Sequence, residues 1–152
     1  MSQYRLSLRL YNAASEMECC LGHSQQTDKL VDEILQRART FADRLRAYET
    51  KIYSLGSRQE MPQAIDLALV VFKKLGEKFP RTPSLLTIAY EMFSTKHMLS
   101  KKTEDDILGL SPLRDWRKAA VLRIMQLVFP SVMRGCPKLA PVLACRCIKI
   151  TL

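Results

Sequence analysis

The sequence is poor in residues that break helices. Its 152 residues include only five glycines, and the seven prolines stand apart as punctuation between stretches rich in Leu, Ala, Lys and Arg. Aromatic residues make up 7% of the chain, but hydrophobic residues as a whole make up 47%, enough for a folded core. Scarce glycine and abundant helix formers predict an all-α protein.

The glycine motifs that hold nucleotides are missing. A Gly-Lys dipeptide occurs nowhere, which excludes the GxxxxGK[ST] phosphate loop, and GxGxxG is absent as well. Without clustered backbone N–H groups ahead of a helix, a nucleotide phosphate has no cradle. The sequence therefore predicts a protein with no cofactor, and no arrangement of residues in it points to an enzyme.

Metal-ligand spacing is missing too. The cysteines are odd in number, and the pairs Cys19-Cys20 and Cys145-Cys147 lack the two-residue gap with which paired thiolates hold zinc. We expect reduced thiols in a cytoplasmic protein and no metal site. Only two histidines are present, and His97 has no carboxylate at helical spacing to orient its ring, so a helix-end histidine is favoured over a catalytic base.

No long hydrophobic run is present. The best stretch, from Ile124 to Met133, is interrupted by Pro130 and is too short to cross a bilayer. The start MSQYRLSLRL has neither the apolar segment nor the cleavage site of a secretory signal. We therefore expect no transmembrane segment.

The positive charge of the chain is concentrated in its last third. The net charge is +9, and residues 112–152 contain eight basic residues against the single acid Asp115. Such a region could bind an acidic partner, and the candidate partner-binding residues are Arg117, Lys118, Arg123 and Arg146. A solvated helix face is the alternative interpretation. Trp116 lies among these basic residues, but no second aromatic platform accompanies it, so we expect a core tryptophan and no nucleic-acid partner.

Apolar residues in the first third recur at helical spacing. The first series ends at Gly22, where glycine tolerates a left-handed conformation; it consists of Leu6, Leu10, Tyr11, Ala14, Met17 and Leu21. A second series follows on a helix that Ser24 or Thr27 could cap, and it consists of Leu30, Val31, Ile34, Leu35, Ala38, Phe41 and Ala42. The pattern then returns, with one series before Gly56 and one after Pro62.

Sliding the sequence against itself by 34 positions aligns identical residues in these two stretches. The aligned pairs are Ala13 with Ala47, Leu21 with Leu55, Gly22 with Gly56, Gln25 with Gln59, Asp32 with Asp66 and Leu35 with Leu69. A helix pair of about this length is typical of tetratricopeptide repeats, which bury their apolar faces by stacking on one another. We expect two such pairs over residues 3–80, with a core that includes Tyr11, Ala14, Leu35, Tyr48, Ala64 and Phe72.

Residues 81–152 predict a degenerate helical continuation. Pro80 and Pro83 impose a break, after which Ser84 can cap a helix to about Leu99. The residues expected to face inward on that helix are Leu86, Ala89, Tyr90 and Phe93. A short helix within 101–112 is followed by one from 115 to 128, with an expected core of Trp116, Ala119, Ala120, Leu122 and Ile124. A last helix from about residue 138 completes an array of about seven helices, and we expect it to be truncated at the C-terminus.

Three stretches resemble a known family: "LGEKFPRTPS", "DDILGLSPLRDWRKAAVLRIMQLVFPSV" and "CPKLAPVLACRCIKITL". They are similar to the helical region that follows the predicted ATPase domain in very large signalling proteins, which also contain kinase-like, GAF and sensor histidine kinase modules. The chain departs from the family's LPxMTDP motif at residues 110–116, and Lys78 stands where a phosphoacceptor motif ending in Arg-Thr-Pro would have histidine. The resemblance implies a connector or regulatory array and brings no catalytic residue to this chain.

These observations lead to two functional hypotheses. The first is a noncatalytic helical-repeat scaffold or connector, a fragment of a multidomain ATPase or histidine kinase signalling protein, which contacts neighbouring domains or a partner peptide. The alternative is a standalone adaptor that binds an acidic partner through the basic C-terminal third.

Overall fold

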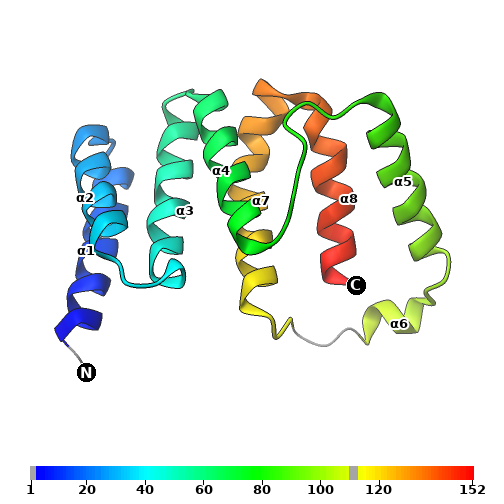
Figure 1. The fold of residues 1–152 in the computed structure, drawn as a ribbon, viewed down its shortest axis with the longest axis horizontal. Helices are drawn as coiled ribbons and strands as arrows, with labels where there is room; N and C mark the ends of the chain where they lie inside the picture. The colour runs from blue at the N-terminus through cyan, green and yellow to red at the C-terminus, as the bar shows by residue number, and fades with distance from the viewer. Residues whose placement is uncertain (1–2, 110–112) are drawn as a thin grey trace. The chain divides into compact units, whose positions relative to one another are not determined.

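The chain folds into α-helices, as the sequence predicts (Figure 1). The computed structural model describes residues 3–109 and 113–152. Within these ranges it contains eight α-helices, one 3₁₀-helix and no strand. The elements are α1 (Gln3–Cys20), α2 (Ser24–Arg37), α3 (Phe41–Ser57), α4 (Met61–Leu75), α5 (Leu85–Leu99), α6 (Glu104–Leu108), α7 (Trp116–Gly135), η1 (Pro137–Leu139) and α8 (Ala140–Thr151).

The chain divides into two compact units. The first extends to Leu67 and the second begins at Ala68, so the division falls inside α4. The sequence predicts a boundary at residues 80 and 81, where the prolines interrupt the helical pattern. In the structure that interruption is the loop between α4 and α5, within the second unit.

In the first unit, α1, α2 and α3 pack against one another, and α1 lies antiparallel beside α2 (Figure 1). Their buried core contains Val31, Ile34, Ala38 and Ala47. The partly buried residues Leu8, Tyr11 and Leu35 pack against it. Helix α3 begins with a capping box, in which Thr40 accepts from the backbone N–H of Asp43 and the Asp43 side chain accepts from that of Thr40.

The helix pairs repeat, but with an offset of 37 residues rather than 34. Helices α1 and α3 end at Cys20 and Ser57, and α2 and α4 begin at Ser24 and Met61, 37 positions apart in both cases. The hydrogen bonds after the two helix ends match at the same offset: the N–H of His23 donates to Glu18, and that of Glu60 donates to Leu55.

The offset of 37 changes the counterpart of Gly22, and the predicted side-chain cap of the second helix was wrong. Gly22 has a positive φ of 79°, as predicted, but its structural counterpart is Gln59, with φ of 63°, and not Gly56. Gly56 lies within α3. Helix α2 has His23 at its N-cap position and no side-chain cap, so neither Ser24 nor Thr27 caps it. Thr27 is fully buried and donates its hydroxyl proton to the carbonyl of His23.

In the second unit, α8 packs against α7 and against α5 (Figure 1). Buried residues of α7 and α8 include Ile124, Val128, Val132 and Leu143. The predicted end of α7 near residue 128 was wrong, because the helix continues through Pro130 to Gly135. Buried residues lie on both sides of Pro130, so tertiary packing outweighs the loss of one N–H donor.

The remaining elements follow their sequence signals. Ser84 caps α5 by accepting from the N–H of Thr87 at 3.1 Å, and Thr103 begins α6 with a capping box to Asp106. Residues 110–112, where the departure from the family motif begins, lie outside the described residues. None of the helices in the described part of the chain is long and apolar enough to span a bilayer.

The predicted repeat core is present to different degrees. Tyr48, Ala64 and Phe72 are buried. Tyr11, Ala14 and Leu35 are half-buried. The offset of 37 aligns Tyr11 of α1 with Tyr48 of α3, so these two predicted core residues occupy equivalent positions in the two helix pairs.

Candidate interaction surface

Helix α5 faces the protein with its polar side. Glu91 is 5% exposed and Thr95 is also buried, while Thr87, Ile88 and Met98 on the same side are half-buried. Thr95 satisfies its hydroxyl within the helix by donating to the carbonyl of Glu91 at 2.7 Å. A buried carboxylate needs partners from another element, and α8 supplies them.

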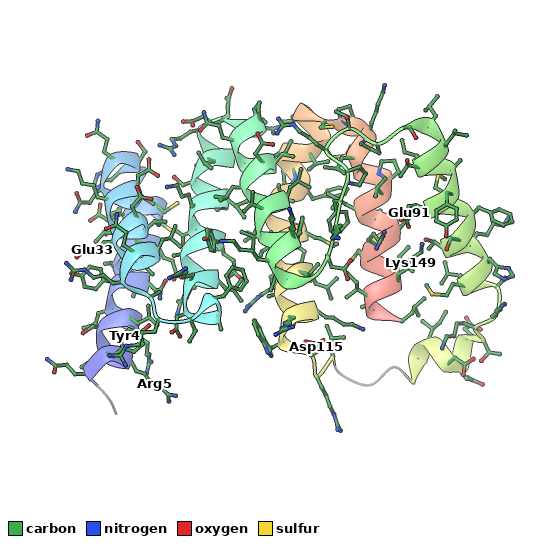
Figure 2. All side chains as sticks on the ribbon, in the orientation of Figure 1. Tyr4, Arg5, Glu33, Glu91, Asp115 and Lys149 are labelled. Carbon is green, nitrogen blue, oxygen red and sulfur yellow. The ribbon has the colours of Figure 1, made fainter. Side chains whose placement is uncertain are left out.

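The carboxylate of Glu91 lies between two cations of α8. Its Oε1 accepts from Nε of Arg146 at 2.9 Å, and its Oε2 accepts from Nζ of Lys149 at 2.6 Å. Arg146 and Lys149 are three positions apart, which places them on one face of α8. Figure 2 shows Glu91 and Lys149 in the space between α5 and α8. Helix α5 is therefore attached to α8 by charge-assisted hydrogen bonds.

One further group completes this charge cluster, which we define as Glu77, Glu91, Arg146 and Lys149. Nη1 of Arg146 also lies 3.4 Å from Oε2 of Glu77, in the loop after α4. The guanidinium of Arg146 lies over the ring of Phe79, 5.9 Å from its centroid. With two acids and two bases, the cluster is electrically neutral.

The pKa of Glu91 reflects this environment. Burial alone would raise the pKa of the carboxyl group, because it disfavours the charged form. The hydrogen bonds and the positive charges of Lys149 and Arg146 outweigh that effect, so the pKa of Glu91 is lowered from its ordinary value of 4.5. The carboxylate is therefore ionised when it holds α5 in place.

The opposite side of α5 is apolar and faces outward. We call this surface the α5 outer face; its residues are Leu85, Leu86, Ala89, Tyr90, Met92 and Phe93. Leu86 is 83% exposed and Phe93 is 74% exposed. The prediction that Leu86, Ala89, Tyr90 and Phe93 point into the core was wrong. The helix is rotated by about half a turn from that prediction because Glu91 pairs with α8.

Helix α1 shows the same inversion in the first unit. Its side toward α2 and α3 contains the buried polar residues Asn12 and Ser15. Its outward side, which we call the α1 outer face, consists of Leu6, Leu10, Ala13 and Met17 of the helix, with Leu21 just beyond it. Met17 is 66% exposed. Of the predicted apolar series from Leu6 to Leu21, only Tyr11 and Ala14 are half-buried, and the other residues are exposed.

The predicted partner-binding residues lie on two helices. Arg117, Lys118 and Arg123 are exposed on α7. A helix turns by about 100° per residue, so Arg117 and Arg123 point about 120° apart around α7. Arg146 lies on α8, within the charge cluster. The structure thus separates Arg146, which binds acids of its own unit, from the three residues of α7.

Trp116 is not a core residue, contrary to the prediction. It is 49% exposed at the first turn of α7, and the guanidinium of Arg117 lies 5.5 Å from its ring centroid. Ala120 and Ile124 are buried as predicted, and Ala119 and Leu122 are half-buried. The start of α7 therefore presents an aromatic ring and basic groups to solvent.

The sequence contained no decisive signal for the two outer faces. On α5, the apolar positions at helical spacing form a normal amphipathic pattern, which favours burial of Leu86 and Phe93. Glu91 is the single charge between Leu85 and Lys96, but its partners lie 55 and 58 residues later on α8. No local pattern predicts such a distant pairing. No family model, curated protein or solved structure matches the chain.

Proposed function

We propose that the chain is a noncatalytic helical module that holds other protein segments against its surface. The observation that carries this proposal is the α5 outer face, where five large apolar side chains are exposed on one helix: Leu85, Leu86, Tyr90, Met92 and Phe93. Contiguous apolar surface of this kind marks sites of protein contact, because water disfavours its exposure.

The charge cluster supports the proposal because it fixes the orientation of α5. Removing Glu91 from its partners would leave a buried acid and two cations without hydrogen bonds, which is costly. The helix therefore cannot rotate to bury Leu86 and Phe93 without losing these contacts. The cluster presents the apolar side to a partner instead.

The repeated helix pair supports a helical-repeat scaffold, and its offset of 37 residues is longer than the 34 typical of tetratricopeptide repeats. In such arrays each pair has apolar surface on both sides, and neighbouring helices cover it. The exposed apolar residues of the α1 outer face are of the kind that a neighbouring helix covers. The resemblance of residues 75–83 and 112–127 to the region beside a predicted ATPase domain supports a place in a large signalling protein, where the module would connect domains.

A site-specific photocrosslink tests this function. Benzoylphenylalanine is placed at position 86, in the α5 outer face, and at Gln36, an exposed polar position of α2, as a matched control. We expect position 86 to crosslink to one defined protein segment in cells that express the chain, with far less product from position 36. Equal, diffuse products from both positions would contradict the proposal.

An adaptor for an acidic partner is the second candidate function. It is favoured by the exposure of Arg117 and Lys118 beside Trp116 at the start of α7. Binding of a labelled oligoglutamate peptide should then weaken steeply with added salt, because the contact is electrostatic. The double substitution Arg117→Glu with Lys118→Glu should abolish it. Binding that is insensitive to both changes would rule out this candidate.

A further inference from the structure

The outward side of α1 has the spacing of a coiled-coil seam. Leu6, Leu10, Ala13, Met17 and Cys20 follow one another at intervals of four, three, four and three residues, and all five are exposed. This is the heptad pattern with which two helices pack along their length. Helix α1 has 18 residues and is about 27 Å long, so the seam spans several helical turns.

The side of α1 that faces α2 and α3 already packs within its own unit. Nδ2 of Asn12 donates to the carbonyl of Leu8 at 2.9 Å, and Oγ of Ser15 donates to the carbonyl of Asn12 at 2.9 Å. Leu8 and Tyr11 pack against the core of the unit. The apolar seam is therefore additional to the contacts that hold α1 in the fold.

The charges along α1 are reversed with respect to its helix dipole. Arg5 and Arg9 lie in the N-terminal half, where the dipole is positive, and Glu16 and Glu18 lie in the C-terminal half, where it is negative. Arg5 extends from the N-terminal end of the helix in Figure 2. An isolated helix gains nothing from this order. An antiparallel neighbour with the same order would place its acids beside these arginines and its arginines beside these acids.

The two acids near the C-terminal end of α1 also have partners within the chain. Both oxygens of Glu16 bind Arg46, and Glu18 contacts Nδ1 of His23 at 2.7 Å. Glu16 and Glu18 are opposite in charge to Arg5 and Arg9.

We propose that the α1 outer face binds the α1 outer face of a second copy of this chain, in antiparallel orientation about a two-fold axis. In this register Leu6 of one copy faces Met17 of the other, and Leu10 faces Ala13. The small Ala13 leaves room for the larger Leu10, and the two-fold axis repeats each contact. The inference rests on the proposed function, because it assigns a partner to one of the two outer faces.

A single helix pair is a small interface. Specific protein contacts usually bury about 1,000 Å² or more, and one seam of this length lies near the lower end of that range. The dimer therefore forms and dissociates with concentration. Such an equilibrium would let a module that contacts other segments through α5 bring two copies of them together.

Sedimentation equilibrium over a range of protein concentrations tests the dimer. We expect the average mass of the wild-type chain to rise from monomer towards dimer, and Leu10→Glu to abolish the rise. Leu10 is 61% exposed in the single chain and glutamate is a good helix former, so this variant should keep its circular dichroism spectrum. The matched control Leu86→Glu changes the α5 outer face and should leave the dimer intact.

Several results would overturn the inference. They are a wild-type chain that stays monomeric throughout, a dimer that survives Leu10→Glu, and a dimer that is lost with Leu86→Glu instead. A monomeric wild type whose position 86 still crosslinks to a partner would leave the proposed function standing. A dimer with no specific crosslink at position 86 would support the inference and contradict the proposed contact at the α5 outer face.

Disulfide mapping tests the orientation. In the antiparallel register position 3 of one copy lies beside Cys20 of the other, whereas the two Cys20 residues are about 25 Å apart, beyond the reach of a disulfide. Under mild oxidation Gln3→Cys should therefore give an intermolecular bond between positions 3 and 20, identified by peptide mass spectrometry. A bond between the two Cys20 residues of the wild-type chain would show parallel helices and overturn the proposed arrangement.

Discussion

The two sides of α8 hold their neighbouring helices by different physical means. Toward α7, Leu143 of α8 lines an apolar groove together with Met125 and Phe129. Toward α5, Arg146 and Lys149 hold the carboxylate of Glu91. Apolar contact is strong but weakly directional, whereas hydrogen bonds between charges require one orientation of the helix. Helix α7 is therefore held by burial, whereas charge sets the rotation of α5.

The largest effect should come from the apolar side. Leu143→Ala removes a side chain that is 1% exposed, and we expect it to lower the free energy of unfolding of the second unit by about 2–5 kcal/mol. Urea denaturation followed by circular dichroism measures this loss. The control Ala144→Ser changes an exposed neighbour on the same helix and should have little effect. Equal stability of the two variants would show that α7 and α8 do not depend on this contact.

Glu91→Gln tests the charged side and should have the second-largest effect. The substitution keeps the shape of the side chain but removes the charge that binds Arg146 and Lys149. We expect the free energy for local opening of α5 to fall by about 1–3 kcal/mol. In hydrogen exchange, the amides of α5 should become less protected while those of α7 stay unchanged.

Glu77→Gln provides the matched control for this change. Glu77 contacts Arg146 only at 3.4 Å, and its side chain is 26% exposed, so solvent already screens the pair. We expect a smaller loss of protection in α5 than Glu91→Gln causes. A loss as large from Glu77→Gln would mean that Glu91 is not the residue that fixes α5.

Acid should release α5 before it affects α7. The pKa of Glu91 is lower in the folded protein than its ordinary value of 4.5, so ionised Glu91 favours the folded state. Its contribution is complete above pH 4.5 and is lost as the pH falls through the lowered pKa. Amide chemical shifts of α5, followed by NMR from neutral pH downward, should change in that acidic range and not above it. In the Glu91→Gln variant this transition should be absent.

The elements were predictable to the extent that their signals are local. Ser84 and Gly22 act through neighbouring residues, and the structure confirms both the cap and the positive φ. The predictions that were wrong failed for nonlocal reasons. Pro130 normally ends a helix, but the buried residues on either side of it extend α7, and these depend on packing that no local pattern specifies.

The repeat offset shows how identity can mislead. The shift of 34 aligns Gly22 with Gly56, but the backbone turns at Gln59, which is three residues later. Two amphipathic helices can be aligned at several offsets that differ by about one helical turn, and apolar residues match in each alignment. Identities alone therefore do not fix the register. The hydrogen bonds after each helix do fix it.

The candidate surface was the least predictable part. Both outer faces contain residues that the helical pattern assigns to an inward face, and their exposure depends on which side of the helix has polar partners elsewhere. For α5 these partners are Arg146 and Lys149, and the sequence predicts Arg146 as a contact to an external acid instead. Counting charges along the sequence identifies Arg146 as a basic residue but does not identify Glu91 as its acidic partner.

The smallest effect on stability should come from Leu86→Glu, which sharpens the contrast with Leu143. Leu86 is exposed at the first turn of α5, and that turn contains no acid. A glutamate there loses little packing and gains a favourable interaction with the helix dipole of about 0.3–1 kcal/mol. We expect the urea midpoint to stay the same or to rise slightly. A fall comparable to that of Leu143→Ala would mean that Leu86 is packed in solution, and the difference between the two sides of α5 would then disappear.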